Sequence, residues 1–278
     1  RVSGFQKYGE TNAVIPSGNA VDNIHGIKNY NDGVLVAQGS NLYWTNNGTS
    51  YVQVNKNTYV TKTGTVAVTA GSAAVAGTGT LFTTEFSVND RIEINSIDYR
   101  VLSITNDTSL TLDFNVVTSA TSQAVKKSGI SAGSLAAATT IPRTGQTNVQ
   151  FISFEASGVN GTVYFADGIN KVGEFQIDAD GYHFEELERS TPVGCSLIEK
   201  YAERLILSGK ATDPSVVYYS TRLKPYDFEG ASAGLVDVGD TVTGIKVFRN
   251  SLVIFCKNSI FELTNLDSAP IIKSITKN

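Results

Sequence analysis

The 278-residue chain contains no methionine, one tryptophan, two histidines and two cysteines. A catalytic zinc site usually draws on three histidines, on two histidines with a glutamate, or on a mixed cysteine and histidine set. His25 and His183 have no neighbour at ligand spacing, so the sequence indicates no metal site and we expect no cofactor. Cys195 and Cys256 lie in apolar segments, which predicts two reduced, buried thiols and no disulfide framework.

Two further features are missing from the sequence. No stretch of 18 apolar residues is present, so we expect a soluble chain with no membrane insertion. The formal net charge is −4 and the Lys and Arg residues are scattered, whereas nucleic-acid binders gather cations on one face to neutralise phosphates. The absence of methionine in a chain that begins at Arg1 predicts a processed chain or a fragment of a longer polypeptide.

A repeat of 47 residues organises the second half of the chain. Phe154, Tyr201 and Phe248 lie 47 residues apart, and each ends an apolar strand that is followed by a turn, a second strand, a turn and a third strand. A fourth copy at the front has Tyr30 in the aromatic position. A period of 40 to 50 residues built from short strands is typical of β-propeller blades. We therefore expect the three later aromatics to occupy equivalent buried positions.

The first and second copies are separated by additional sequence. The segment 61–127 is rich in Thr, Ala, Val and Ser and alternates strands with turns, and the residues after it are small and polar. The fold class predicted is all-β, with about four visible blades of a larger propeller and an inserted small β-sandwich or barrel domain. The alternative is a four-bladed ring closed by the N-terminal strand RVSGFQKYG. The predicted parts are the N-terminal strand and first blade at 1–58, the inserted domain at 59–127, a linker at 128–147, and further blades at 148–278 that continue beyond the chain end.

One catalytic pattern is present, the G-x-S-x-G run from Gly230 to Gly234 with Ser232 at its centre. This pattern forms a nucleophile elbow only on a strand-to-helix turn, with a histidine later in the chain. Both histidines precede Ser232 and no helix is predicted after it, so we interpret the run as a flexible loop of small residues.

The acidic residues have structural explanations too. Glu185, Glu186 and Glu188 could supply the two carboxylates of a glycosidase, but a charged edge strand that discourages unwanted pairing explains them without function. Asp178 and Asp180 resemble the start of a calcium loop whose later ligands are missing, and a hairpin turn explains them better. We expect no enzyme activity and assign no catalytic or metal-binding residue.

The aromatic side chains offer one candidate binding surface. Trp44 with Asn46 and Asn47 forms the best cluster for a sugar-binding platform. Every copy of the repeat carries aromatics at equivalent positions, which is what packing between blades requires. Core filling is therefore the favoured explanation of Trp44.

The blade segments ERLILSG, VVYYSTRLKPYDFEG and VTGIKVFRNSLVIFCKNSIFELT, with the opening RVSGFQKYG, resemble the propeller blades of tail nozzle proteins of short-tailed bacteriophages, a group that includes tail stabilisation proteins. The inserted segment, from VAVTAGSAAVAGTGTLF to SLTLD, is similar to a small β-domain that recurs in phage tail and neck proteins. Together the two patterns cover most of the chain.

The resemblance implies a structural virion protein, assembled in the host cytoplasm and located in the tail. It implies six copies in a ring that docks below a portal adaptor, contacts other tail proteins and continues the DNA channel. DNA passes through the lumen without specific binding, and the mild acidity of the chain is compatible with such a wall. The alternative from a different class is a receptor- or glycan-binding propeller, with Trp44 and neighbouring turns as its site.

Overall fold

The computed structural model describes residues 24–30, 33–39, 41–46, 51–56, 58–129, 148–156, 159–178, 181–187 and 191–275. β-Strands are the main secondary structure of these residues, and the single helix among them, α1 (Phe82–Glu85), has four residues. The all-β prediction is confirmed. The N-terminal segment RVSGFQKYG lies outside the described residues, and with it the proposed closing strand.

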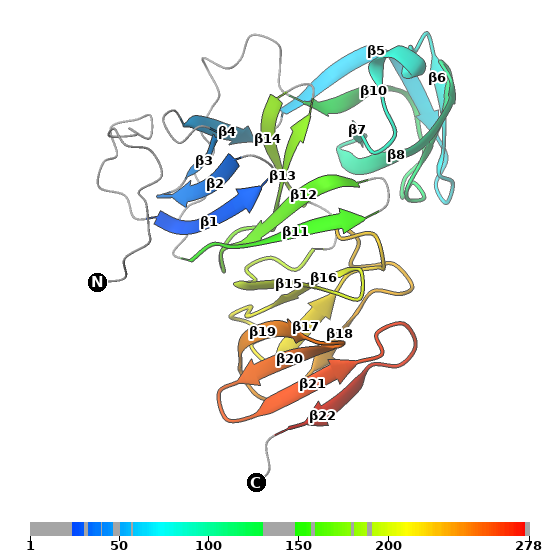
Figure 1. The fold of residues 1–278 in the computed structure, drawn as a ribbon. Helices are drawn as coiled ribbons and strands as arrows, with labels where there is room; N and C mark the ends of the chain where they lie inside the picture. The colour runs from blue at the N-terminus through cyan, green and yellow to red at the C-terminus, as the bar shows by residue number, and fades with distance from the viewer. Residues whose placement is uncertain are drawn as a thin grey trace. The chain divides into compact units, whose positions relative to one another are not determined.

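Sixteen strands form four units of four, in which consecutive strands are neighbours (Figure 1). We call these units blades 1 to 4. Blade 1 contains β1 (Ile24–Tyr30), β2 (Gly33–Gln38), β3 (Asn41–Thr45) and β4 (Val52–Lys56). Blade 2 contains β11 (Gln150–Ala156), β12 (Val159–Ala166), β13 (Gly173–Asp178) and β14 (Gly181–Glu186). Blade 3 contains β15 (Leu197–Tyr201), β16 (Arg204–Ser208), β17 (Val216–Tyr219) and β18 (Gly234–Asp237). Blade 4 contains β19 (Val242–Phe248), β20 (Ser251–Cys256), β21 (Ile260–Thr264) and β22 (Ile271–Ser274). Blades 2, 3 and 4 thus each have one strand more than the three that the repeat pattern predicted.

Blades 1 and 2 are joined at their last strands into one eight-stranded sheet. β4 and β14 pair in parallel, with Phe184 opposite Lys56. β14 therefore lies between β4 and β13, and the interpretation of its glutamates as an edge-strand charge is wrong. Glu185 is buried in this inner strand, and Glu188 lies outside the described residues.

Both faces of the blades are apolar, because neighbouring residues of a strand point to opposite faces. In β15, Leu197 packs into the core shared by blades 3 and 4, whereas Ile198 packs into the core shared by blades 2 and 3. Phe165 and Phe175 of blade 2 join Trp44 of blade 1 in a third core. Each blade is thus packed between its neighbours in chain order. We call the face toward the next blade the forward face and the face toward the preceding blade the back face.

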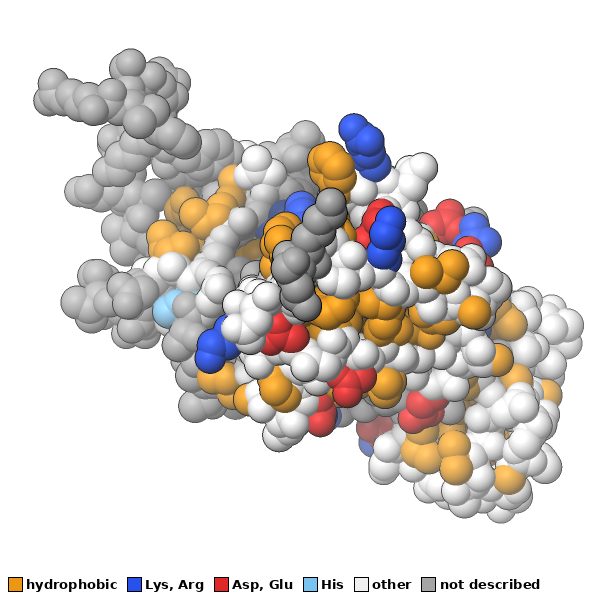
Figure 2. All heavy atoms as spheres, turned by 90° about the horizontal axis from the view of Figure 1, so that it is seen from below, with side chains coloured by type: hydrophobic (Ala, Val, Ile, Leu, Met, Phe, Trp, Pro, Cys, Tyr) orange, Lys and Arg blue, Asp and Glu red, His pale blue; other side chains and the backbone are white. Residues whose placement is uncertain are grey.

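The repeat aromatics all lie on first strands and on forward faces. Phe154 is fully buried among blade 3 residues, Tyr201 is partly buried beside blade 4, and Tyr30 is buried beside blade 2. Phe248 is 64% exposed, so the prediction that it is buried is wrong. It occupies the same position in its strand as Tyr201, since both close the turn into the second strand, but no blade of the described residues covers the forward face of blade 4. Figure 2, which views the molecule from below Figure 1, shows hydrophobic side chains gathered at the surface.

The insertion between blades 1 and 2 forms a closed six-stranded barrel with the strand order β10-β5-β6-β9-β8-β7. Its strands are β5 (Thr58–Val68), β6 (Ala74–Thr78), β7 (Arg91–Ile94), β8 (Ile97–Asn106), β9 (Ser109–Leu112) and β10 (Ala120–Gly129). Residues 57–138 with 179–181 form one compact unit, and the remaining residues form another. The sequence placed the inserted domain at 59–127 and a linker from 128, but β10 continues to Gly129, which pairs with Thr58.

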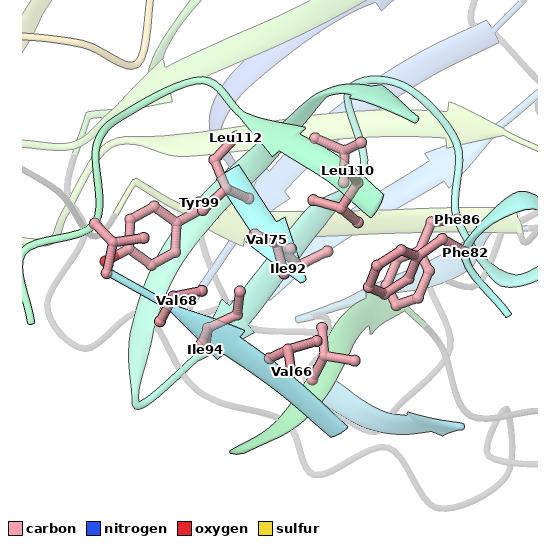
Figure 3. Packing of buried hydrophobic residues seen from close by; sticks show 13 residues of the cluster. Val66, Val68, Val75, Phe82, Phe86, Ile92, Ile94, Tyr99, Leu110 and Leu112 are labelled. Carbon is pink, nitrogen blue, oxygen red and sulfur yellow. The ribbon is translucent and has the colours of Figure 1, made fainter. Parts of the chain in front are cut away.

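The barrel has its own core (Figure 3). Ile92 and Ile94 alternate with polar residues along β7, and Val66 and Val68 are buried on either side of the less buried Ala67 on β5, so one side of each strand points inward. α1 begins after Leu81 and directs Phe82 into this core, where its ring meets that of Phe86 at 5.7 Å. The six strands thus close around an interior filled by residues of the barrel itself.

The contrast between Phe154 and Phe248 leads to a prediction about stability. Phe154→Ala should lower the free energy of unfolding by about 3 to 5 kcal/mol, because it leaves a cavity between two blades. Phe248→Ala is the matched control at the same repeat position and should change stability by no more than about 0.5 kcal/mol, as for exposed sites generally. Urea unfolding of both variants measures the difference. Equal losses would show that the two positions are equally buried in solution.

Candidate assembly surface

The structure buries Trp44, the aromatic residue of the predicted sugar platform. Trp44 is 4% exposed, and its ring lies 6.1 Å from that of Tyr30 and 5.9 Å from that of Phe175. The ring therefore packs in the core between blades 1 and 2 and does not offer a face for stacking on a sugar. Asn46 is exposed, and Asn47 lies outside the described residues.

The described residues contain no group of three or more His, Cys, Asp or Glu side chains placed to hold a metal ion. Within the same residues no helix has the length and apolar character needed to cross a bilayer. Asp178 ends β13 and Gly181 begins β14, so the segment compared with a calcium loop connects two adjacent strands.

Ser232 lies in a loop that leads into β18, and its surroundings are dominated by Arg204. The Arg204 side chain is 1% exposed. Its Nη1 donates to the carbonyl oxygens of Ser220 at 2.8 Å and Ser232 at 2.6 Å, and its Nη2 donates to Asp267 Oδ1 at 2.8 Å. The buried guanidinium of Arg204 thus binds both ends of the loop between β17 and β18 in blade 3. It also binds the loop between β21 and β22 in blade 4.

Removing the guanidinium of Arg204 should lower the stability of the folded protein. Arg204→Ala leaves two carbonyl oxygens without their donor inside the protein, so we expect a loss of about 3 to 5 kcal/mol in the free energy of unfolding. Arg222→Ala is the matched control, because Arg222 also belongs to blade 3 but forms its pair with Glu203 in solvent. Urea unfolding should show a much smaller loss for the control. Similar losses for both variants would contradict the clamp.

Cys195 is buried beside a polar cluster. Lys210 Nζ lies 2.6 Å from Asp213 Oδ2, which also accepts from the Tyr218 hydroxyl at 3.0 Å. Burial raises the pKa of the Cys195 thiol to about 12, although Lys210 acts in the opposite direction. Cys256 is partly exposed, and burial raises the pKa of its thiol as well. Neither cysteine forms a disulfide.

The two thiols should therefore react differently. The thiolate is the reactive form, and a pKa of about 12 leaves about one Cys195 in ten thousand ionised at pH 8. In the Cys256→Ser variant, Ellman's reagent should release no colour from native protein and one equivalent in urea, while Cys195→Ser should react without denaturant. Because the folded pKa lies above 9.0, this thiol's contribution to stability is present below pH 9 and is lost between pH 9 and about pH 12. Rapid native labelling of Cys195 would contradict its burial.

The junctions between blades are made by the first strands. The ammonium of Lys200 on β15 lies 4.8 Å from the centre of the Phe154 ring on β11. The Tyr201 hydroxyl of β15 donates to the carbonyl oxygen of Asn250 in the turn after β19, at 2.8 Å. Lys246 Nζ of β19 lies 2.6 Å from the buried carboxylate of Glu199 on β15, which occupies the same repeat position 47 residues earlier. These three contacts thus join blades 2 and 3 and blades 3 and 4 through their first strands.

The forward face of blade 4 has a regular arrangement that we call the open face. Strand register places Lys246, Val253, Glu262 and Lys273 in one row across the four strands. Apolar side chains lie on either side of this charged row. They are Phe248 and Ile271 on one side, and Phe255, Ile260 and Ile275 on the other. Four of these five, all except Ile260, are classed among the exposed large hydrophobic residues.

The sequence analysis missed the open face and the Arg204 clamp. The repeat spacing does contain a signal for one contact between blades 3 and 4. Glu199 and Lys246, which form an ion pair, are separated by one repeat period. No such signal exists for Arg204, whose partners come from loops of unequal length in two blades.

No protein-family model and no curated protein matches the chain. Among solved structures, the chain is similar to an endosialidase of phage phi92, with 11% identity and a TM-score of 0.30. It is also similar to PorZ, a surface component of the type-IX secretion system of Porphyromonas gingivalis (10%, 0.32), and to the extracellular domain of the one-component system BT4673 of B. thetaiotaomicron (9%, 0.33). These matches cover 91%, 91% and 95% of the chain, which spans only 45%, 26% and 34% of the three structures.

Proposed function

We propose that the chain is a structural protein of a phage tail, a component of the nozzle through which DNA leaves the virion. The observation that carries the proposal is the combination of serially packed blades with a closed barrel inserted after the first blade. This is the combination on which the resemblance to tail nozzle proteins was based. In this proposal the blades form a rigid wall, copies assemble into a ring of about six, and the barrel and loops contact the portal adaptor and other tail proteins.

The charges of the chain support a channel wall with low affinity for DNA. The formal net charge is −4. Several cations of the described residues are already held by carboxylates, including Arg204 by Asp267, Lys246 by Glu199 and Lys126 by Glu93. A paired cation releases fewer counterions on meeting a phosphate, so the salt-dependent part of DNA affinity should be small.

Two measurements test this function. Fluorescence anisotropy with a labelled 30-base-pair duplex should show negligible binding at physiological salt, with a basic DNA-binding protein as the positive control. Gold-labelled antibody against the chain should decorate the tail vertex of the virions that carry it. Steeply salt-dependent DNA binding in the micromolar range or tighter contradicts the passive channel. Virions without tail label contradict the structural role.

A further inference from the structure

We propose that the loop between β17 and β18 of blade 3 docks on another protein of the tail, which receives Leu223 in an apolar pocket. We call residues 220–233 the docking loop. The inference deepens the proposed function and rests on it, because it names a surface through which the chain contacts a neighbouring tail protein. Its support comes from the length of the loop, from the contacts that hold it and from the side chains that it exposes.

The docking loop is longer than the fold of a blade requires. The third and fourth strands are joined by fourteen residues in blade 3, by six in blades 1 and 4, and by two in blade 2. Two residues are therefore enough to complete a four-stranded blade. Connections of more than about 12 residues without helices or strands of their own are uncommon, and unless they are disordered they usually serve a function.

The docking loop belongs to a blade that has both of its neighbours. Blade 3 packs against blade 2 through one core and against blade 4 through another. The loop connects the ends of two strands and therefore lies at an edge of the sheet, whereas blades pack on its faces. Packing of blade on blade thus leaves this edge in water.

The docking loop has a fixed shape. Asp227 is 3% exposed, and its Oδ1 accepts from the backbone N–H groups of Glu229 at 3.1 Å and Gly230 at 2.9 Å. The carbonyl oxygen of Asp227 accepts from the N–H of Thr221 at 2.7 Å. Arg204 binds the loop at both ends, as described above. A loop that is ordered before it binds loses little conformational freedom on docking, which favours recognition.

The first part of the loop holds Leu223 in a conformation that leucine rarely adopts. Leu223 has a φ of 61° and is 40% exposed. Its N–H donates to the carbonyl oxygen of Glu203 at 2.8 Å, in the turn between β15 and β16, and Glu203 itself has a φ of 56°. Left-handed backbone is unfavourable for residues other than glycine, asparagine and aspartate. It persists where the surrounding contacts compensate for it, and such positions cluster at binding sites.

Core filling explains a different part of the loop. Tyr226 and Phe228 pack against the core shared by blades 2 and 3. Leu223 belongs to none of the four cores formed by the residues that the structure describes. The contacts of the second part of the loop therefore leave the exposure of Leu223 without a structural reason.

The side chains around Leu223 suit an uncharged, apolar partner surface. Arg222 Nε and Nη2 lie 2.6 Å and 2.5 Å from Glu203 Oε2. Because this carboxylate already neutralises Arg222, the guanidinium has little to gain from a phosphate or an acidic peptide. An aliphatic side chain in water is stabilised by entering an apolar pocket. These features favour a protein pocket lined by apolar side chains over a nucleic acid.

Photochemical cross-linking in intact virions identifies what Leu223 touches. The probe is p-benzoylphenylalanine, placed in the full chain instead of Leu223. The matched control places it instead of Ala211, which is exposed in the connection between β16 and β17 at the opposite edge of blade 3. After irradiation, mass spectrometry should find position 223 joined to a different tail protein, and position 211 should give at least tenfold less of that product.

Leu223→Asp tests whether this contact holds the chain in the tail. Aspartate adopts left-handed backbone more readily than leucine, so the folded loop should tolerate it, whereas a carboxylate in an apolar pocket has no partner. Quantitative immunoblotting of purified virions should show at least tenfold less of this variant than of the wild type. Ala211→Asp should be incorporated like the wild type, and urea unfolding verifies that both variants are folded.

Three results overturn the proposal. They are no cross-link from position 223, a cross-link only between copies of this chain, and incorporation of Leu223→Asp at the wild-type level. If the wild-type chain labels the tail in the same experiment, each of these results overturns the docking loop and leaves the proposed function standing. Virions without tail label overturn both.

Discussion

Packing between blades is the interaction on which the rest of this structure depends. A four-stranded sheet can leave one face in water only if that face is polar, and the strands of blades 2 and 3 carry apolar side chains on both faces. Such a sheet is stable only between two others. The three inter-blade cores therefore do more than add stability, because they set the order in which the blades must lie.

Polar contacts fix the alignment of neighbouring blades, which packing of apolar side chains leaves less well defined. Apolar faces alone tolerate sliding, whereas a hydrogen bond demands a particular alignment of donor and acceptor. Arg204 supplies three such alignments at once, to Ser220, Ser232 and Asp267. Glu199 and Lys246 supply another between first strands. We infer that these contacts hold blades 3 and 4 in one register, and that Ser232 serves this purpose mainly through its backbone carbonyl, at 2.6 Å from Arg204 Nη1, with its hydroxyl at 3.4 Å from the same nitrogen.

The barrel illustrates how a repeat structure can carry an insertion. Its six strands close on themselves, so it has no free edge that could pair with β4 or β14. Its core is made of its own residues, from Val66 to Val125. Blades 1 and 2 are still joined directly by the parallel pairing of β4 with β14. The inserted domain can therefore vary in sequence and contacts without changing the blade packing.

The sequence by itself determined the parts that repeat along the chain. Alternating apolar residues and short turns predicted the strands of blade 1 and most of those of blades 3 and 4. The 47-residue spacing placed Tyr30, Phe154, Tyr201 and Phe248 on equivalent first strands. The change of composition after residue 60 marked the insertion. These features are local, since each depends on side-chain periodicity and turn residues within about ten positions.

Only the tertiary structure decided which of these equivalent residues are buried. Phe248 has the same sequence context as its buried counterparts, and no local pattern records whether a neighbouring blade covers it. The pairing of β4 with β14, which made Glu185 an inner-strand residue, joins segments more than 100 residues apart. The hydrogen-bond partners of Arg204 likewise lie in loops that are distant in the sequence. Burial, strand neighbours and buried hydrogen bonds depend on contacts between remote segments, and for that physical reason they could not be deduced from periodicity.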